Sequence, residues 1–407
     1  MTEIDSCNQN LCDFSPIEPL SRKESSYPDA IGAWIAEMDY PVAPAILDVV
    51  RRNVDASLLS YVDAPIRKRA LEATAAWLEH RFGYAPPKGS LFLVADIIAG
   101  YESVLRVLAR EDAPVIVPTP AYHLLLHTPQ YFGRKLIELP CAVSATGRYL
   151  IDYEGLDAVL EPGAVFALTN PYNPVGQVFT RSELGRLAEI IDAHNALVFA
   201  DEVHSPLILD PRVRHIPYAS VSQAAAEHSV TAISASKSFN ITGLKCAQLI
   251  IPGERLRKAW KPYAFFYGDG VSRLGLYAAA TAYADPHCTR WLDETLGRIR
   301  GNLAFAREYF AEHNPHVVLS QHQATYLLWM DLRWWDLGAR PADYLLKHAR
   351  VALNDGEDFG SPGFVRLNMA LEPGRFEEAV RRISAALDTA ERREESTVNG
   401  HGGETDE

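Results

Sequence analysis

Short apolar runs alternate with amphipathic stretches over much of the chain. Six runs have the continuous apolar character of strands that are buried on both faces. They span residues 91–96, 114–118, 164–169, 197–201, 230–234 and 247–252. The stretches between them repeat apolar residues at helical spacing. This alternation predicts an α/β fold, in which helices sandwich a mostly parallel sheet.

The pattern changes after residue 270. A long helical stretch near 271–312 is followed by an apolar run at 324–332 and an amphipathic helix at 341–351. A second apolar run with Arg366 and a final helix to about 392 complete a smaller α+β domain.

The length of 407 residues suits more than one core. We divide the chain into an arm that forms part of the small domain (1–45), a large domain (46–270), a connecting helix with the small domain (271–392) and a tail (393–407). The tail is polar and is expected to be disordered.

Composition narrows the classes of function. The net charge of -13 disfavours nucleic acid and anionic membrane surfaces as partners. We expect no membrane segment and no export leader. The odd number of cysteines, without metal-ligand spacing, favours reduced thiols in a cytoplasmic protein. They are Cys7, Cys12, Cys141, Cys246 and Cys288.

Three histidines lie close together at His313, His316 and His322. Pro315 separates the first two and breaks their presentation on a helix. No carboxylate or cysteine set completes a ligand group, so we expect no metal site.

The segment TAISASKSFNITGLK (231–245) carries the strongest chemical signal. An apolar strand ends in Ser234 and Ser236, and Lys237 stands where the chain must turn. An amine there can be desolvated enough to act as a nucleophile, and nearby hydroxyls can hold an anion. This favours a Schiff-base lysine for pyridoxal phosphate. A solvent-facing lysine at a strand end is the simpler alternative.

Two upstream segments strengthen the first interpretation. Asp201 ends the apolar run 196–200, and ligands of open α/β sheets bind at that edge. A carboxylate there can pair with the pyridine nitrogen of pyridoxal phosphate, or can simply cap a turn. Asn173 follows another strand, in a segment with two Asn-Pro turns. Its side-chain amide could bind an oxygen atom of a ligand, or the residue could simply form the turn. Thr180 and Glu183 then predict a capping box.

Together, NPYNPVG, ADEVH and SASKSFNITGLK occur in the order found in one family. The chain resembles fold-type I pyridoxal-phosphate enzymes of the class I/II aminotransferase group over roughly residues 15–390. WIAEMDYPVAPAI near the N-terminus, the Asp-Glu-Val-His sequence and the residues after Lys237 resemble the cystathionine β-lyase-like C–S lyases.

The resemblance implies a role for each matching residue. Lys237 forms the Schiff base, Asp201 pairs with the pyridine nitrogen and Asn173 donates to the ring 3-oxygen. Tyr122 stacks on the cofactor ring, or is a core tyrosine with a satisfied hydroxyl. His204 takes a position that often holds a tyrosine in the wider group. His204 could hydrogen-bond the ring 3-oxygen of the cofactor or orient Asp201. Alternatively, it is a structural histidine.

The resemblance also implies how the substrate binds. Arg366 clamps the α-carboxylate with its planar fork, and Asn173 also belongs to the substrate-binding residues. Trp34 lines the side-chain pocket, or packs the N-terminal arm. Tyr61 reaches the phosphate of a neighbouring subunit, which implies a homodimer with shared active sites.

The phosphate cradle is expected within 95–110, where a strand end and Gly100 precede a helical pattern. Free backbone N–H groups at a helix start bind anions. We expect the side chain of Glu102 to point away. Lys245 replaces a phosphate-binding arginine of many relatives. The candidates for the cradle are Gly100, Tyr101, Glu102, Ser234, Ser236 and Lys245.

The implied reaction is β-elimination on cystathionine or another cysteine S-conjugate, giving a thiol, ammonia and a 2-keto acid. Freed Lys237 is the natural base for the Cα proton. Transamination and decarboxylation would use the same residues and stay open, as does the identity of the conjugate. The alternative from a different class of function is a regulatory protein that has kept the fold but catalyses no reaction. Such a protein would have no need to keep Lys237, Asp201, Asn173 and Arg366 together.

Overall fold

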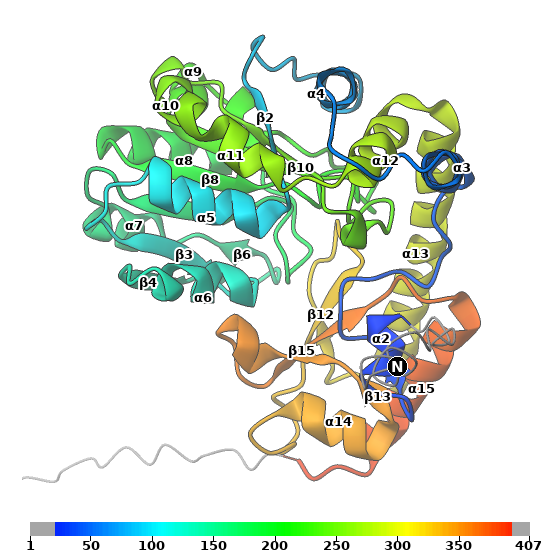
Figure 1. Ribbon diagram of the computed structural model, residues 1–407. Helices are drawn as coiled ribbons and strands as arrows, with labels where there is room; N and C mark the ends of the chain where they lie inside the picture. Colours follow the sequence, from blue (N-terminus) through cyan, green and yellow to red (C-terminus); the bar gives the residue numbers. More distant parts are fainter. Residues whose placement is uncertain (1–20, 393–407) are drawn as a thin grey trace, which may run out of the picture.

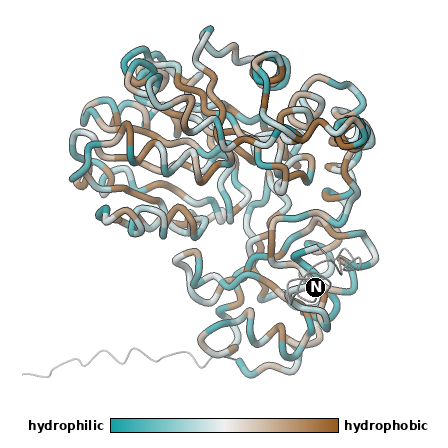
Figure 2. The backbone as a smooth tube through the Cα atoms, viewed as in Figure 1, coloured by the Kyte–Doolittle hydropathy of each residue, from teal (hydrophilic) through white to brown (hydrophobic). Residues whose placement is uncertain are grey.

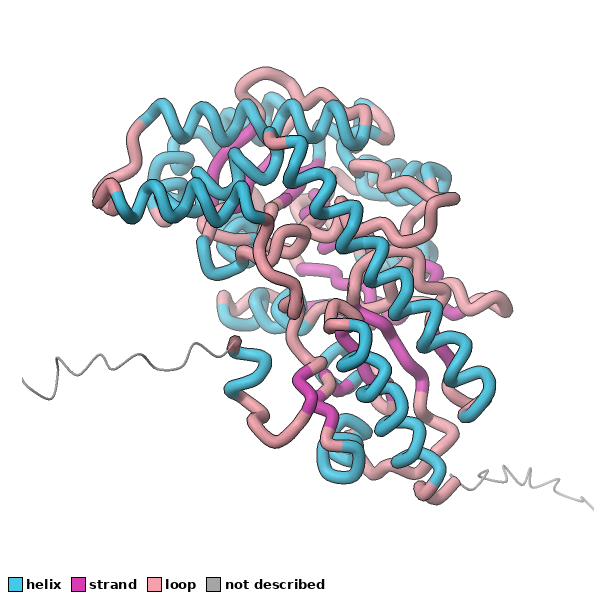
Figure 3. Tube along the Cα trace, turned by 90° about the vertical axis from the view of Figure 1, so that its right-hand side faces the viewer, coloured by secondary structure: helices cyan, strands magenta, loops and turns pink. Residues whose placement is uncertain are grey.

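The computed structural model describes residues 21–392. Cys7, Cys12 and the predicted disordered tail lie outside the described residues. Two lobes are visible in Figure 1, a larger one around a wide sheet and a smaller one around a short sheet. The long helix α13 (Pro286–His313) runs from the larger lobe to the smaller one, as the side view in Figure 3 also shows.

The large sheet confirms the predicted mostly parallel arrangement. Its order is β2-β10-β9-β8-β7-β3-β4, and only β10 is antiparallel to its neighbours. The strands are β2 (Leu91–Val94), β3 (Val115–Thr119), β4 (Leu136–Pro140), β7 (Val165–Thr169), β8 (Leu197–Asp201), β9 (Ser229–Ile233) and β10 (Ala247–Ile250). The sequence pattern missed β4, an edge strand in which only one residue, Leu139, is buried.

Each face of this sheet carries its own core. In β8, Leu197 and Phe199 join one cluster, while Val198 and Ala200 join another. Because strand side chains alternate between faces, a strand covered on both sides reads as a continuous apolar run. The apolar strands inside the larger lobe are visible in Figure 2.

Helices of the larger lobe cover both faces of the sheet (Figure 1). They are α4 (Ala64–Phe82), α5 (Ile97–Val107), α6 (His123–Tyr131), α7 (Tyr153–Val159), α8 (Arg181–Ala193), α9 (Gln223–His228), α10 (Glu254–Trp260) and α11 (Ala264–Asp269). The predicted capping box of Thr180 and Glu183 begins α8. A small hairpin of β5 (Ala142–Val143) and β6 (Tyr149–Leu150) lies between β4 and α7 in the sequence.

The long helix expected near 271–312 is in fact two helices, α12 (Arg273–Ala284) and α13. Asp285 has an extended backbone and caps α13 through the N–H of His287. Pro286 takes the first helical position, where it loses no hydrogen bond. The continuous apolar pattern concealed this break.

The smaller lobe contains a sheet of order β11-β12-β15-β14, antiparallel throughout. Its strands are β11 (Val318–Leu319), β12 (Leu327–Asp331), β14 (Asn354–Asp355) and β15 (Phe364–Asn368), with helices α14 (Pro341–Ala349) and α15 (Pro373–Asp388).

The N-terminal arm joins this lobe. β1 (Ile31–Gly32) pairs in parallel with β13 (Val351–Ala352), after α2 (Arg22–Ser25) and before α3 (Pro44–Asp55). The domain boundaries themselves stay a prediction.

Within residues 21–392, no helix is both long enough and apolar enough to cross a membrane. The same residues contain no group of three or more His, Cys, Asp or Glu that could hold a metal ion. Two of the neighbouring histidines stack on aromatic rings, His313 on Tyr309 and His316 on Trp334.

Candidate active site

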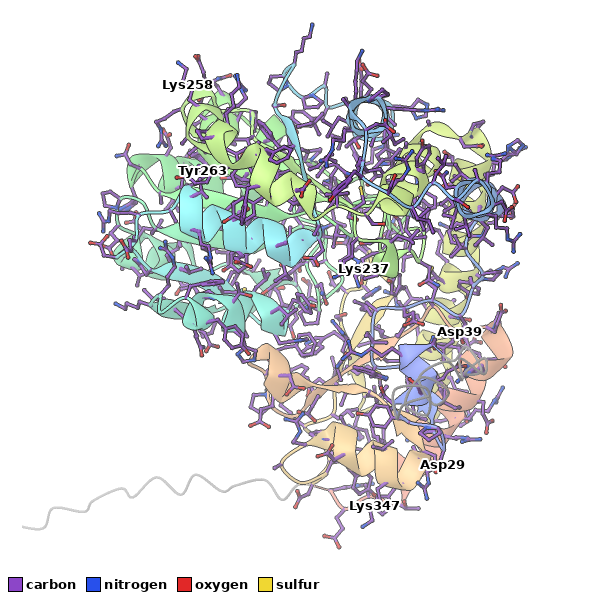
Figure 4. The ribbon with its side chains drawn as sticks, in the orientation of Figure 1. Asp29, Asp39, Lys237, Lys258, Tyr263 and Lys347 are labelled. Atoms are coloured by element: carbon purple, nitrogen blue, oxygen red, sulfur yellow. The ribbon has the colours of Figure 1, made fainter. Side chains whose placement is uncertain are left out.

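The carboxyl edge of the large sheet gathers three of the predicted residues. β7 and β8 are paired in register so that Thr169 lies beside Asp201, and Asn173 follows in the turn after β7. β9 lies on the other side of β8 and ends at Ile233, shortly before Lys237. Parallel strands bring their carboxyl ends to one edge, the usual ligand site of such sheets. Lys237 lies on the side of the larger lobe that faces the smaller one (Figure 4).

Burial sets the charge states of Asp201 and Lys237. Asp201 is 5% exposed and accepts the N–H of Val203 at 3.1 Å. Its burial raises the carboxyl pKa to about 6, while Lys237 acts in the opposite direction. Burial, aided by Arg366, lowers the pKa of the Lys237 amine to about 8. An amine that is partly neutral near physiological pH can act as a nucleophile or base.

Arg366 is a buried cation held by neutral oxygens. It lies on β15 and donates to Asn173 Oδ1 at 3.0 Å, Asn354 Oδ1 at 2.5 Å and the carbonyl of Trp34 at 3.3 Å. Its guanidinium lies 4.6 Å from the centre of the Phe359 ring. Burial lowers its pKa to about 10.

No carboxylate within residues 21–392 forms an ion pair with Arg366, and its Nε has no hydrogen-bond partner there. A buried guanidinium without an anion is costly, so this site favours a carboxylate ligand. Asn173 uses its oxygen for Arg366, which leaves its Nδ2 without a partner among these residues.

His204 and Tyr122 lie near these charged groups. His204 is 3% exposed, and burial lowers its pKa to about 3, with Lys237 and Arg366 acting in the same direction. Its neutral ring packs edge-on to Tyr326, and Nδ1 has no partner among the described residues. Burial raises the pKa of Tyr122 to about 12, and the charges of Arg366 and Asp201 act on it in opposite directions.

The start of α5 corrects the predicted phosphate cradle. The helix begins at Ile97, and the N–H of Gly100 already bonds to Asp96 O at 3.0 Å inside the first turn. The expectation that Gly100, Tyr101 and Glu102 offer the free N–H groups of the helix start is therefore wrong. The N–H groups of this helix end lie earlier, in the first turn from Ile97, where the Asp96 side chain already accepts the N–H of Ala99 at 2.8 Å.

Each of these three residues has another task. A Cβ at Gly100 would lie 2.9 Å from the Leu249 side chain, so the glycine allows the helix to pack closely on β10. Tyr101 is fully buried against Phe199. Glu102 pairs with Arg106 along the helix surface, so its side chain points away as expected.

The three side chains predicted to bind the phosphate differ in whether a donor is still available. They are Lys245, Ser234 and Ser236. Lys245 Nζ lies 2.7 Å from Asp96 Oδ2, which places a cation beside the start of α5. Ser234 Oγ donates to Cys246 O at 2.7 Å and accepts the N–H of Ser236 at 3.1 Å. Its only proton is used, so the prediction of Ser234 as a phosphate donor is wrong. Ser236 remains a candidate.

Residues 33–40, which we call the strap, cross the site from the N-terminal arm. The Trp34 side chain packs within the arm, donating to Lys23 O at 3.3 Å and lying edge-on to Tyr27. The alternative of arm packing therefore describes this side chain, and only its carbonyl reaches Arg366. Ala36 O accepts from Lys237 Nζ at 3.4 Å and from the hydroxyl of Tyr326 at 3.2 Å.

The sequence interpretation missed the residues that hold the strap. Asn368 Nδ2 donates to the carbonyls of Ile35 and Glu37 at 2.8 and 2.7 Å. Asn240 accepts the N–H of Met38 and donates back to its carbonyl, both at 3.0 Å. No local pattern marks these asparagines, because their partners lie hundreds of residues away.

Two carboxylates, the partly buried Asp39 and the buried Glu202, support the strap and the sheet edge. Lys23 is 1% exposed, pairs with Asp39 and donates to Glu37 O at 3.3 Å. Glu202, beside Asp201 in sequence, lies 3.0 Å from His215 Nε2 and accepts the N–H of Tyr218 at 2.7 Å. The Asp-Glu sequence placed Glu202 at the strand end, but it did not reveal that His215 and Tyr218 are its partners.

Tyr61 lies apart from these groups on the surface. Its side chain is 94% exposed, and Leu59 beside it is 62% exposed. Its carbonyl accepts from Arg273 at 2.8 Å. Contact with a neighbouring subunit stays a prediction.

The family described as "Aminotransferase class I and II" matches residues 35–383. Cystathionine β-lyase of Corynebacterium glutamicum is 31% identical over 363 residues, covering 88% of this chain and 94% of that protein. Cystathionine β-lyase PatB of Bacillus subtilis is 31% identical over 369 residues, covering 88% and 93%.

Among solved structures, a protein from Corynebacterium diphtheriae assigned as a pyridoxal-phosphate-dependent β-cystathionase is 32% identical. Its TM-score is 0.83, and the match covers 90% of this chain and 96% of that one. The chain therefore belongs to the class I and II aminotransferase family, which confirms the predicted family and fold class.

Proposed function

We propose that this protein is a pyridoxal-phosphate-dependent carbon–sulfur lyase. It performs β-elimination on cystathionine or another cysteine S-conjugate and releases a thiol, ammonia and a 2-keto acid. The observation that carries the proposal is the buried Arg366, which has no ion-pair partner among residues 21–392, together with the partly buried Lys237, whose amine is influenced by the charges of Arg366 and the buried Asp201. The names of the two lyase relatives support the choice of reaction.

The residues present fit pyridoxal phosphate. Lys237 supplies the amine for its aldehyde, Asp201 a buried carboxylate for its ring nitrogen and Asn173 a free amide N–H for its ring oxygen. The start of α5 and Lys245 would hold the phosphate, and its binding would displace the Asp96 carboxylate, which caps this helix end and pairs with Lys245. When bound, the cofactor draws electrons from the substrate Cα and so makes the Cα proton acidic.

Arg366 orients the substrate. A planar guanidinium binds an α-carboxylate through two hydrogen bonds, which fixes the position of Cα relative to Lys237. Trp34 O, Asn173 and Asn354 already hold the guanidinium in place before substrate arrives. Little reorganisation is then needed on binding.

Lys237 moves the proton. Its amine pKa of about 8 leaves a useful neutral fraction at pH 7 to 8, so Nζ can take the Cα proton. The electron pair of that C–H bond forms the Cα–Cβ double bond, and the C–S bond pair leaves with the thiolate. Hydrolysis of the remaining three-carbon unit gives ammonia and the 2-keto acid.

Asp201 supplies a fixed negative charge. With a pKa of about 6 it is mostly ionised at neutral pH, and Val203 N–H and Lys237 stabilise the ionised form. A buried carboxylate opposite the ring nitrogen favours the protonated nitrogen, which strengthens electron withdrawal.

The assembly and location are part of the same proposal. The exposed Tyr61 and Leu59 support a homodimer in which Tyr61 enters the partner's site. We keep the cytoplasm as the predicted location. Analytical ultracentrifugation tests the dimer. Weaker cofactor affinity in Tyr61→Ala tests the shared site, and a monomeric protein with normal cofactor affinity would contradict both.

The test of function uses holoenzyme and cystathionine with no keto acid added. We expect stoichiometric release of thiol, ammonia and keto acid, and none with Lys237→Ala. Turnover that appears only when a keto-acid acceptor is supplied would overturn the lyase and make the protein an aminotransferase. Cystathionine together with two simpler cysteine S-conjugates then ranks the leaving groups.

A further inference from the structure

A cavity of about 630 Å³ lies outside the candidate active site. It is formed by α13, the loop after β8 and the segment before β12. Neither Lys237, Asp201 nor Arg366 lines it. Its wall includes Arg212, Arg300, Arg307, Asp210, Gln321 and Gln323.

This cavity has an excess of positive charge in a chain whose net charge is -13. Asp210 is the only carboxylate in the wall, and Arg212 already binds it through Nε at 2.9 Å and Nη2 at 2.8 Å. Arg300 and Arg307 form no ion pair with any residue in 21–392. Two guanidinium groups therefore face the cavity without an anion.

The two arginines come from one face of one helix. They lie seven positions apart on α13, with Leu303 and Ala304 of the same wall between them. Residues spaced by three, four and seven share a side of an α-helix. Partial burial lowers the pKa of Arg307, with Asp210 raising it and Arg212 lowering it further. The helix thus presents two arginines of the wall from one side, two turns apart.

The two glutamines of the wall differ, because Gln321 already donates its Nε2 to Thr146 O and keeps an acceptor oxygen, whereas Gln323 keeps its donors. Gln323 uses its Oε1 to accept the N–H of Val178 at 3.1 Å, which leaves its amide N–H groups free of described partners. A site of guanidinium forks and amide donors suits two negative charges on one small molecule. A cavity of this volume has room for an organic anion of that size.

The wall of this cavity is bonded to the loops of the candidate active site. Gln323 N and Ala324 N both donate to Gly176 O at 2.8 Å. Gly176 belongs to the turn that carries Asn173, the residue that holds Arg366. Gly176 has φ +75°, and a Cβ there would overlap the imidazole of His322.

A second connection reaches the other loop. Leu209 N and Asp210 N donate to Gln323 O at 2.8 and 3.0 Å. These residues continue the chain from Asp201 and His204. On the cavity side, Arg307 Nη2 donates to His322 O at 3.0 Å. A ligand that draws Arg307 toward it therefore acts on the segment that both loops share.

We propose that this cavity is an effector site for a small organic polyanion, and that its occupancy changes the affinity of the active site for substrate. The path runs from Arg307 through residues 322–324 and Gly176 to Asn173 and Arg366. Binding at the cavity is independent of the reaction, whereas the coupling rests on the proposed function.

The binding test uses holoenzyme, in which the cofactor already occupies its phosphate site. Titration calorimetry at low ionic strength with citrate, and separately with pyrophosphate, distinguishes a polycarboxylate from a phosphate ligand. We expect one probe to bind, and its affinity to fall at least about tenfold in the double variant Arg300→Gln/Arg307→Gln. The matched control is Arg290→Gln, an exposed arginine of the same helix outside the cavity.

Three results would overturn the site. They are no binding of either probe, equal weakening in Arg290→Gln, and binding that survives the double variant but is lost in Arg366→Ala. The last result would place the anion in the active site. A double variant Arg300→Lys/Arg307→Lys with intermediate affinity would support recognition by the guanidinium forks, beyond charge alone.

The coupling test measures KM and kcat for cystathionine with and without the bound probe. We expect KM to change by severalfold with a smaller change in kcat, and the effect to vanish in Arg300→Gln/Arg307→Gln. A probe that binds without changing KM would overturn the effector role. Since calorimetry needs no turnover, a failed lyase assay leaves the binding result interpretable.

Discussion

The two halves of the active site are built in different ways. The sheet-edge half comprises Asn173, Asp201 and Lys237, which follow neighbouring parallel strands. The strap half comprises the strap with Arg366 and Asn368 of β15. Backbone topology gathers the first half, whereas hydrogen bonds between segments more than 300 positions apart assemble the second.

The halves also differ in electrostatics. The sheet-edge half holds an acid and an amine whose pKa values burial moves toward each other, to about 6 and about 8. In the strap half, a single cation is held by side-chain amide and backbone oxygens. The comparison indicates that the first half moves protons and the second holds substrate.

The largest effect is expected for Lys237→Ala. Loss of both nucleophile and base should reduce keto-acid release by about 10⁴-fold or more. The measurement is keto-acid release under saturating substrate, with thermal unfolding as the check that the variant folds. Near-normal rates would remove Lys237 from the chemistry.

The next effect is expected for Asp201→Asn, which keeps the shape but removes the charge. Proton loss from Cα should slow by about 10²- to 10³-fold because an electrostatic stabiliser is lost. Exchange of the Cα proton with deuterium, followed by NMR, isolates this step. Substrate affinity should change little, and unchanged exchange would mean that another group serves the ring nitrogen.

A smaller effect is expected for Arg366→Ala in the strap half. This variant should change substrate affinity rather than the rate of proton loss. KM should rise by about 10- to 100-fold, as for a lost charge-assisted hydrogen bond, with a smaller change in kcat. Arg366→Lys keeps the charge without the fork and should recover only part of the affinity. An ordinary KM in both variants would show that the carboxylate binds elsewhere.

The pH dependence of cofactor capture tests the burial of Lys237. Only the neutral amine reacts, and its pKa of about 8 is below the usual value because of burial. The capture rate of apoenzyme should therefore rise about tenfold from pH 7 to 9 and then level off. An unshifted lysine would keep rising roughly tenfold per pH unit to about pH 10. Stopped-flow absorbance distinguishes the two profiles.

The smallest effect is expected for Lys23→Met, which disturbs the strap from outside the pocket. Asp39 loses a buried partner, although Arg375 lies 3.6 Å away and compensates in part. A loss of roughly 1 kcal/mol in positioning corresponds to about a fivefold rise in KM. Lys23→Arg should restore KM, whereas a fall in kcat alone would assign Lys23 to another role.

The sequence by itself determined much of the sheet-edge half. Continuous apolar runs marked the inner strands, and polar residues just after them marked the ligand edge, because parallel strands end together. Lys237, Asp201 and Asn173 could be identified without coordinates for this reason. The same local logic placed Thr180 and Glu183 at the start of α8.

Only the tertiary structure decided which hydrogen-bond partners most polar groups of the site have. One miss was local: Asp96 caps α5 through the N–H of Ala99, three residues away, so Gly100 lies within the helix. The Ser234 hydroxyl is taken by Cys246 O, and Trp34 reaches Arg366 through its carbonyl rather than its ring. A local pattern encodes periodicity and turns, whereas a hydrogen-bond partner 200 or 300 residues away is chosen by packing.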